Sequence, residues 1–185
     1  MPSLRPGDQL SGFRIEAFVE SGATSEVYRA VACNTGSPVA IKLLHPAWCS
    51  VSTIRSRFEN EGRMLLGLRH PNIVRVLAIG EDPIGQPFLT LEWVPNDLRK
   101  HLQSTADGIA EPAVLRLATQ VADALCVLHS NGLIHRDLKP ANILLTSRRL
   151  LDAEVRLADL GLAKHLLGSY PGPVDASSLS KVSTA

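Results

Sequence analysis

Short apolar runs separated by turn residues fill the first part of the chain. Residues 27–31 (VYRAV) and 39–42 (VAIK) are rich in β-branched and aromatic side chains, and the segment 34–37 (NTGS) between them has the composition of a tight turn. Runs of this kind, bounded by Gly, Asn, Ser and Pro, are typical of strands joined by hairpins. We therefore expect antiparallel strands over residues 13–44.

The spacing of the apolar residues then changes to that of a helix. Phe58, Glu61, Leu65 and Leu68 recur at intervals of three or four residues. This spacing places all four on one face of a helix, which we predict over residues 51–68. A carboxylate therefore shares a helical face with apolar side chains.

Further strands and a second helix are expected beyond this point. The strand-like segments are residues 73–79 and 88–93, with a turn of sequence DPIG between them at 82–85. The helix begins near Pro112, because proline suits a first helical turn, and the pair Asn-Gly at 131–132 ends it. The remaining expected elements are short strands at 143–145 and 155–158 and, from residue 168, a mobile loop rich in Ser, Pro and Gly.

Strands with one helix, followed by a mainly helical segment, predict an α+β chain made of two unequal lobes. We expect an N-terminal extension at residues 1–12 and a first lobe of antiparallel strands with one helix at 13–94. The second lobe, mainly helical and incomplete, is expected at 95–185.

Composition excludes several classes of function. The 19 Lys and Arg residues nearly balance 18 Asp and Glu, and a formal charge of +1 provides no overall field for nucleic acid or an anionic membrane. The three cysteines form no Cys-x-x-Cys pair, which favours a reducing compartment. The start of the chain lacks the apolar core of a signal peptide, and no run of about 18 apolar residues could cross a bilayer. We therefore expect a cytoplasmic protein with no membrane segment and no nucleic-acid partner.

The candidate chemistry gathers in two short runs after the second helix. Residues 135–142 read HRDLKPAN, and residues 159–161 read DLG. The first run resembles the catalytic loop of the protein kinases, and the second resembles their metal-binding Asp-Phe-Gly element with Leu in place of Phe. The pair Lys-Pro at 139–140 resembles the serine/threonine branch of the family. The resemblance implies a two-lobed kinase fold that uses ATP and Mg²⁺ to phosphorylate Ser and Thr hydroxyls of protein substrates.

The same resemblance assigns roles to four residues. Asp137 accepts the proton of the substrate hydroxyl, and Lys139 offsets charge on the transferred phosphoryl group. Asn142 and Asp159 bind magnesium through their side-chain oxygens. A chance His-Arg-Asp in a turn beside a surface lysine is the structural alternative.

A lysine and a glutamate in the first lobe complete the expected catalytic set. Residues 39–42 (VAIK) resemble the family's strand whose lysine, here Lys42, holds the α and β phosphates. A lysine extended over an edge strand is the alternative interpretation. Glu61 favours the first one, because a carboxylate on an apolar helical face is costly to bury without a partner. We expect Lys42 to be that partner, whereas a solvated Glu61 is the alternative.

Nucleotide-binding residues follow from the resemblance as well. Residues 91–94 (LEWV) resemble the hinge, where backbone groups of Glu92 and Val94 bond adenine, and Asp97 reaches the ribose. The apolar residues expected to sandwich the adenine, each of which is equally suited to a plain core role, are Val27, Ala40 and Leu144.

The phosphate-covering loop at residues 19–27 is the weakest match. The family expects Gly-x-Gly-x-x-Gly-x-Val, and only Gly22 remains, at the tip, because Glu20 and Ser25 replace the other two glycines. Glycine allows close backbone approach to phosphate. We therefore expect Glu20 to weaken nucleotide affinity without abolishing it.

Structural and regulatory roles are also implied by the resemblance. His135 is expected to be a packed, hydrogen-bonded core residue in an internal spine with Leu65, Val76 and Leu160, and not an acid or base. Arg136 beside the catalytic aspartate suggests regulation by phosphorylation of the following loop. The candidate acceptors are Ser177, Ser178, Ser180, Ser183 and Thr184.

No Ala-Pro-Glu element follows, so the resemblance predicts a kinase domain truncated within its activation segment. Apolar surface on the Pro112 helix is then expected to be exposed and to favour self-association. Two alternatives stay open: a pseudokinase or nucleotide-binding interaction module, and a small-molecule phosphotransferase of kinase-like fold.

Overall fold

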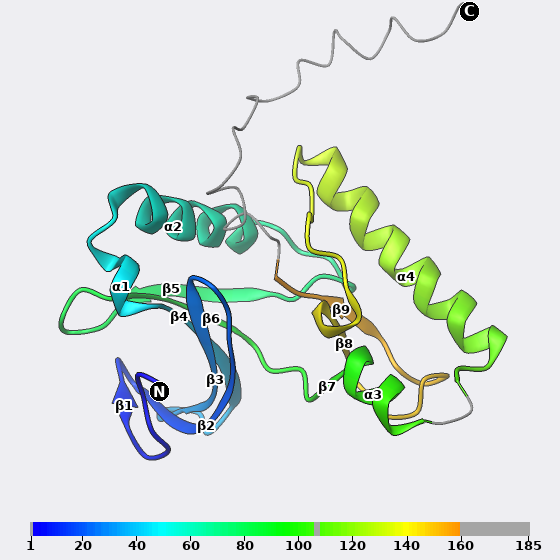
Figure 1. Cartoon of the computed structure of the whole chain (residues 1–185), viewed down its shortest axis with the longest axis horizontal. Helices are drawn as coiled ribbons and strands as arrows, with labels where there is room; N and C mark the ends of the chain where they lie inside the picture. Colours follow the sequence, from blue (N-terminus) through cyan, green and yellow to red (C-terminus); the bar gives the residue numbers. More distant parts are fainter. Residues whose placement is uncertain (1, 106–107, 160–185) are drawn as a thin grey trace, which may run out of the picture.

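A six-stranded antiparallel sheet dominates the N-terminal half of the chain (Figure 1). The structure, a computed structural model, describes residues 2–105 and 108–159. The strand order is β1-β2-β3-β4-β6-β5. The strands are β1 (Gln9–Leu10), β2 (Phe13–Ser21), β3 (Ser25–Ala32), β4 (Pro38–Leu44), β5 (Val76–Glu81) and β6 (Pro87–Glu92).

Two helices connect β4 to β5. The short α1 (Pro46–Cys49) precedes α2 (Ser52–Leu66), which packs on the sheet and buries Phe58, Glu61 and Leu65. Gly62 lies in the middle of α2, where a Cβ atom would come within 2.5 Å of the Leu89 side chain of β6. This glycine therefore brings the helix close to the sheet, which offsets its helix-propensity cost of about 1 kcal/mol.

After β6, residues 93–105 and 108–159 form two further helices and a small sheet. A three-stranded sheet, in the order β7-β8-β9, lies between α4 and the N-terminal sheet (Figure 1). The elements are β7 (Asn96–Asp97), α3 (Leu98–Ser104), α4 (Glu111–Ser130), a 3-10 turn at Pro140–Asn142, β8 (Ile143–Leu145) and β9 (Val155–Leu157). The α+β architecture with two lobes is confirmed.

Most predicted elements occur within two or three residues of their expected bounds. The main difference is the strand expected at 73–79, which begins only at Val76. Ile73 instead forms a parallel bridge with Leu157, and the Val74 amide donates to the Leu157 carbonyl over 2.9 Å. The segment before β5 is therefore tied to the second lobe. The strand expected at 88–93 ends at Glu92, and the loop expected from residue 168 lies outside the described residues.

The N-terminal residues pack as part of the first lobe, although we expected an extension up to residue 12. Strand β1 pairs with β2, and the Gly7 amide donates to the Ile15 carbonyl over 2.9 Å. The amide of Ser3 donates to the Glu26 carboxylate, and the amide of Leu4 donates to the Tyr28 hydroxyl. The sheet therefore includes this segment.

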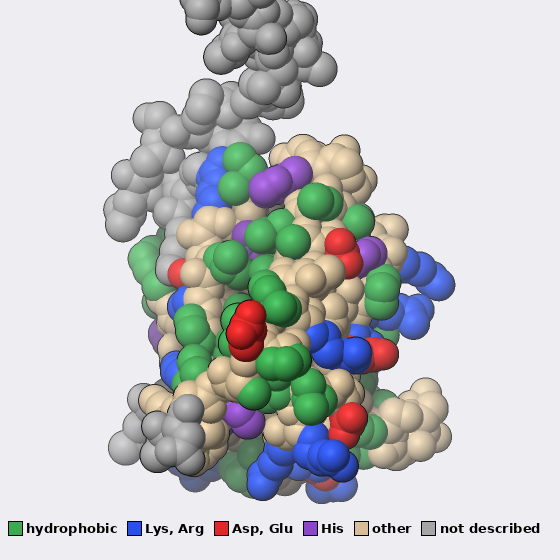
Figure 2. Space-filling model, turned by 90° about the vertical axis from the view of Figure 1, so that its right-hand side faces the viewer, with side chains coloured by type: hydrophobic (Ala, Val, Ile, Leu, Met, Phe, Trp, Pro, Cys, Tyr) green, Lys and Arg blue, Asp and Glu red, His purple; other side chains and the backbone are tan. Residues whose placement is uncertain are grey.

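Buried apolar clusters hold each lobe and the junction between them. One cluster joins Leu65 and Val76 of the first lobe to Leu128 and Leu157 of the second. The outer face of α4 is different, because Val114 and Leu115 are 45% and 60% exposed. Figure 2 shows hydrophobic side chains spread over this side of the molecule. The exposed apolar surface predicted for this helix is therefore present, whereas self-association through it stays a prediction.

Within the described part of the chain, no helix is both long enough and apolar enough to span a membrane.

Candidate active site

A cleft between the two lobes collects most of the predicted site residues. Strands β3 and β4 supply one wall, the segment after β6 supplies the back, and β8 with the residues after β9 supplies the other wall. The predicted residues that line it are Val27, Ala40, Lys42, Glu61, Glu92, Val94, Asp97, Asn142, Leu144 and Asp159. Val27 and Ala40 come from one lobe and Leu144 from the other, so a flat ring could lie between them.

Lys42 lies between two carboxylates at the inner end of this cleft. Its Nζ atom is 3.3 Å from Glu61 Oε1 and 3.0 Å from Asp159 Oδ1. Burial alone would lower the pKa of Lys42, but the charges of Asp159 and Glu61 outweigh it and raise that pKa. Lys42 therefore stays protonated at neutral pH. The pair expected between Lys42 and Glu61 is present, whereas Asp159 as a second partner was not expected.

The two carboxylates have different environments. Burial raises the pKa of Glu61, and the charge of Lys42 only partly offsets this, because the glutamate side chain is just 3% exposed. The charge of Lys42 lowers the pKa of Asp159 against the effect of burial. Asp159 is 36% exposed and has a backbone φ of 52°. This left-handed conformation is uncommon for a residue other than glycine, and such residues gather at functional sites.

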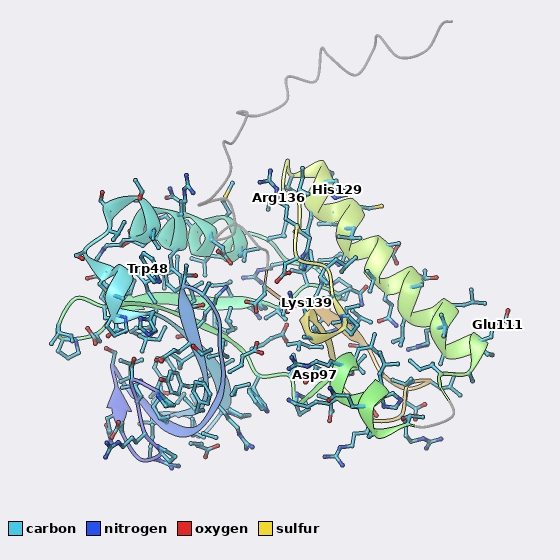
Figure 3. The ribbon with its side chains drawn as sticks, in the orientation of Figure 1. Trp48, Asp97, Glu111, His129, Arg136 and Lys139 are labelled. Atoms are coloured by element: carbon cyan, nitrogen blue, oxygen red, sulfur yellow. The ribbon has the colours of Figure 1, made fainter. Side chains whose placement is uncertain are left out.

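The predicted catalytic loop brings three polar side chains together. Lys139 Nζ is 2.9 Å from Asp137 Oδ2, and Asn142 Nδ2 donates to the same oxygen over 3.2 Å and to the Asp137 carbonyl over 2.8 Å. Arg136 holds the strained position of the loop, with φ of 60°. Figure 3 places Lys139 between the two lobes and Arg136 near the end of α4. Asp137 thus has a fixed orientation and an adjacent cation.

His135 is a core residue, as the sequence indicated. It is 2% exposed, its Nε2 is 3.0 Å from the Ala158 carbonyl, and its Nδ1 accepts from the Asp137 amide. Burial lowers the pKa of His135, so the ring is neutral at pH 7. The neutral ring therefore holds the backbone of two residues of the site: the Asp137 amide, and the carbonyl of Ala158 directly before Asp159.

Asp97 has a role that the sequence did not reveal. Its Oδ1 accepts from the Lys100 amide over 2.8 Å, which makes it the N-cap of α3, and its Oδ2 is 2.8 Å from Lys100 Nζ. The carboxylate therefore holds α3 at the mouth of the cleft. The Asp-x-x-Lys spacing is the only sequence signal for this contact.

The hairpin between β2 and β3 covers the cleft with an acidic residue. Glu20 lines the cleft, and its Oε2 is 3.9 Å from the guanidinium of Arg99 on α3. Gly22 is absent from the lining among the described residues, and a Cβ on it would meet only the Ser25 carbonyl at 3.6 Å. Sequence reasoning missed Arg99, because its partner lies 79 positions earlier in the chain.

Two oxygen donors in the cleft suit a magnesium ion. The side-chain nitrogen of Asn142 donates to the Asp137 carbonyl, which leaves the side-chain oxygen as the metal ligand. The backbone amide of Ala158, the residue before Asp159, donates to the backbone carbonyl of Asn142. Among the described residues no group of three or more His, Cys, Asp or Glu forms a metal cage. A pair of oxygen ligands fits Mg²⁺, which commonly takes one or two protein ligands together with substrate phosphates.

Comparison with known proteins agrees with this geometry. The model of the family described as "Protein kinase domain" matches residues 13–179. The chain belongs to the protein kinase domain family. Leu160 and Gly161 of the predicted metal element, and the five candidate phosphorylation sites, lie outside the described residues.

Named relatives of this kinase domain are serine/threonine-protein kinases. It is 33% identical over 161 residues to pkn3 of Myxococcus xanthus, covering 87% of this chain and 29% of that protein. It is 34% identical over 175 residues to PknI of Mycobacterium tuberculosis, covering 92% and 29%. This kinase domain therefore spans less than a third of the length of these relatives.

Solved structures give the same fold. A crystal structure of the M. tuberculosis PknI kinase domain matches with a TM-score of 0.72 at 32% identity, covering 92% of this chain and 66% of that one. Rad53 in complex with AMP-PNP matches with a TM-score of 0.70 at 29% identity, covering 82% of this chain and 38% of that one.

Proposed function

We propose that this kinase domain transfers the γ-phosphoryl group of ATP, with Mg²⁺, to Ser and Thr hydroxyls of proteins. The observation that carries the proposal is the ion cluster of Lys42 with Glu61 and Asp159, which lines one cleft together with Asn142, the residue that bonds back to Asp137. Phosphoryl transfer depends mainly on positioning and on charge neutralisation, and these groups supply both.

The residues of the first lobe would hold the nucleotide. Lys42, kept protonated and aimed by Glu61, would bind the α and β phosphates. The ring would lie between the apolar side chains of Val27, Ala40 and Leu144. Backbone groups of Glu92 and Val94 would bond its edge. Bound Mg²⁺ would neutralise phosphate charge, held by the oxygens of Asn142 and Asp159.

The residues of the catalytic loop would act on the substrate. Asp137 would accept the hydroxyl proton, since its carboxylate is oriented by Asn142. Lys139, whose Nζ atom is 2.9 Å from that carboxylate, would offset the charge of the transferred phosphoryl group.

A pseudokinase or nucleotide-binding interaction module is the second candidate. The replacement of two glycines in the covering hairpin and the position of Glu20 in the cleft favour it. Retention of Lys42, Asp137 and Asp159 in one arrangement favours the enzyme, because a pure interaction module has no need of a proton acceptor.

Transfer of labelled phosphate from Mg-ATP to a generic protein substrate tests the proposal, with Asp137→Asn as the variant. We expect transfer to Ser and Thr by the native chain and a loss of at least about 100-fold in the variant, consistent with general-base catalysis. Equal rates of phosphate transfer for the native chain and Asp137→Asn, with ATP binding intact, would refute the proposal of a kinase activity and favour the interaction module.

A further inference from the structure

The tip of the hairpin between β2 and β3, at residues 22–25, is held by the segment that follows β4. The indole Nε1 of Trp48 in α1 donates to the Ala23 carbonyl over 3.0 Å. The backbone amide of His45 donates to the Thr24 carbonyl over 2.8 Å. Two consecutive carbonyls of the tip are therefore turned toward α1 and the residue before it.

Trp48 is itself fixed by the core of the first lobe. Its side chain is half-buried, and Figure 3 shows it on α1. The buried cluster against which its ring packs lies between the sheet and α2 and consists of Leu44, Ile54, Phe58 and Leu89. Because the indole N–H lies in the plane of the ring, a packed ring also fixes the direction of this donor. Trp48 thus connects the hairpin tip to a well-packed part of the lobe.

The bond from Trp48 decides where the Thr24 amide points. A peptide bond is planar and trans, so the carbonyl of one residue and the amide of the next point in opposite directions. With the Ala23 carbonyl turned to the indole, the Thr24 amide points away from α1. Across residues 2–105 and 108–159, the amides of Ala23 and Thr24 donate to no other group. The tip therefore presents two adjacent free amides, and Trp48 sets the direction of one of them.

These amides lie next to the strand that borders the proposed phosphate site. In the register of β3 and β4, Val27 pairs with Lys42, and Ser25 pairs with Leu44. Val27 and Lys42 both line the cleft. Adjacent free amides of a turn are well suited to the oxygens of a phosphate group. Since Glu20 and Ser25 replace two of the expected glycines, the tip adapts less to a ligand, and its position before binding matters more.

We infer that Trp48 is a positioning residue for phosphate binding, which holds the hairpin tip so that the Thr24 amide donates to a phosphate oxygen of the nucleotide. The inference rests on the proposed function for the identity of the ligand. Trp48 is absent from the cleft lining within the part of the chain that the structure describes, so it acts through the tip and not by touching the nucleotide. Loss of its N–H should therefore weaken ligands that carry phosphates and leave adenosine unaffected.

Calorimetric titrations of Trp48→Phe with adenosine and with a Mg-bound, non-hydrolysable ATP analogue test the inference. The substitution keeps an aromatic ring in the cluster and removes the N–H. The matched control is Tyr28→Phe, which also removes one donor from an aromatic side chain of the first lobe, at a position outside the described lining of the cleft. Because binding is measured without phosphoryl transfer, a chain that binds the analogue but transfers no phosphate would contradict the proposed function and not this inference.

We expect Trp48→Phe to raise Kd for the Mg-bound analogue about three- to tenfold, as for the loss of one hydrogen bond, and to leave Kd for adenosine unchanged. Tyr28→Phe should leave both affinities unchanged. Equal losses for both ligands in Trp48→Phe, or the same loss in Tyr28→Phe, would show a merely structural role and overturn the inference. Native affinity of Trp48→Phe for the analogue, or a native chain that binds neither ligand, would overturn it as well. Urea unfolding checks that each variant is folded.

Hydrogen exchange of the native chain, followed by NMR, gives a second measurement that needs no variant. The Mg-bound analogue should slow exchange of the Thr24 amide, because a donated hydrogen bond protects it, whereas adenosine should leave the exchange rate unchanged. Exchange at Thr24 that the analogue does not slow would overturn the inference even if Trp48→Phe weakened binding.

Discussion

Replacement of Glu61 by glutamine removes one of the two charges that surround Lys42 while it keeps the size of the side chain. The glutamate is 3% exposed, and its Oε1 lies 3.3 Å from Lys42 Nζ. After the substitution Lys42 depends on Asp159 alone, at 3.0 Å. We predict lower stability and weaker Mg-ATP binding.

The magnitude follows from the distances. Two unit charges 3.3 Å apart attract by about 5 kcal/mol at an effective dielectric constant of about 20, and the cost of burying the carboxylate offsets most of this. Loss of the sole partner of a buried charge costs about 3–5 kcal/mol. Because Lys42 keeps Asp159, we expect a loss of about 1–3 kcal/mol. Mg-ATP affinity should fall about tenfold, since Asp159, the proposed metal ligand, must then hold the lysine without Glu61.

Urea unfolding and calorimetric titration with Mg-ATP measure the two effects. The matched control is Glu59→Gln, which removes surface ion pairs of the same helix to Arg55 and Arg63. Such pairs contribute about 0–1 kcal/mol, so this variant should stay close to the native protein. If Glu61→Gln proved as stable as Glu59→Gln and bound Mg-ATP with native affinity, the Lys42 cluster would not have the role given to it.

Three further predictions concern the covering hairpin and the core. Glu20→Gly should tighten Mg-ATP binding, and Arg99→Ala should weaken it, because the charge of Glu20 then loses its partner. Titration calorimetry measures both affinities. Weaker binding by Glu20→Gly and tighter binding by Arg99→Ala would refute this account of the hairpin. Tyr28→Phe removes the hydroxyl that donates to Glu26 over 2.6 Å and should cost about 1–3 kcal/mol of unfolding free energy. Burial acts to raise the pKa of Glu26, but hydrogen bonds from Tyr28 and Ser3 outweigh it, and the net pKa is lowered. The contribution of these hydrogen bonds to the unfolding free energy is therefore present above pH 4.5 and is lost as pH falls through the lowered pKa. The difference in unfolding free energy between the native protein and Tyr28→Phe should therefore be smaller in acid than at pH 7, as measured by urea unfolding. Leu128→Ala, at a position with 0% exposure, should cost about 2–5 kcal/mol in the same assay at pH 7, and a change under 1 kcal/mol would contradict the packing at the junction of the lobes.

Local patterns made the catalytic loop and most elements predictable. The run at residues 135–142 fixes its own geometry, because Asn142 bonds back to Asp137 five residues earlier. The pairing of Lys42 with Glu61 was also predictable, since a buried carboxylate on an apolar helical face needs a cation. In both cases the decisive constraint lies within a short segment or follows from burial alone.

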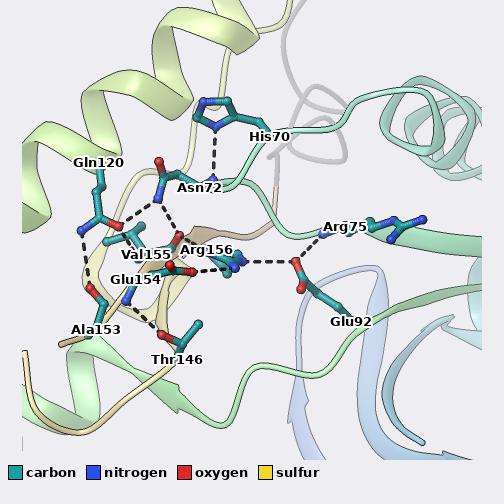
Figure 4. A network of polar contacts seen from close by, with 10 residues as sticks. All are labelled: His70, Asn72, Arg75, Glu92, Gln120, Thr146, Ala153, Glu154, Val155 and Arg156. Carbon is teal, nitrogen blue, oxygen red and sulfur yellow. Dashed lines mark hydrogen bonds and ion pairs between the residues drawn. The ribbon is translucent and has the colours of Figure 1, made fainter.

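Contacts between distant segments were not predictable from one sequence. Asn72 donates to Gln120 and to the Val155 carbonyl, and so ties the segment before β5 to α4 and β9 (Figure 4). Nothing in the local sequence around Asn72 indicates either partner. The same holds for Asp159 beside Lys42, which joins positions 117 residues apart.

Helix α3 was missed for a different reason. It has seven residues and no fully buried side chain, so it lacks the apolar stripe that periodicity detects. Its stability depends on the Asp97 cap and on packing against β7 and β8, which are tertiary contacts. The N-terminal segment is similar, because the buried side chains that hold Ser3 and Leu4 lie on β3, more than 20 residues away.

Calorimetric titration of the chain with a non-hydrolysable ATP analogue, with and without Mg²⁺, tests the central claim most directly. The account predicts that the analogue binds and that magnesium strengthens this binding. Lys42→Met should weaken binding of the analogue, and Asp159→Asn should remove the effect of magnesium. Failure to bind the analogue, or binding that neither variant changes, would contradict the assignment of the cleft as the Mg-ATP site.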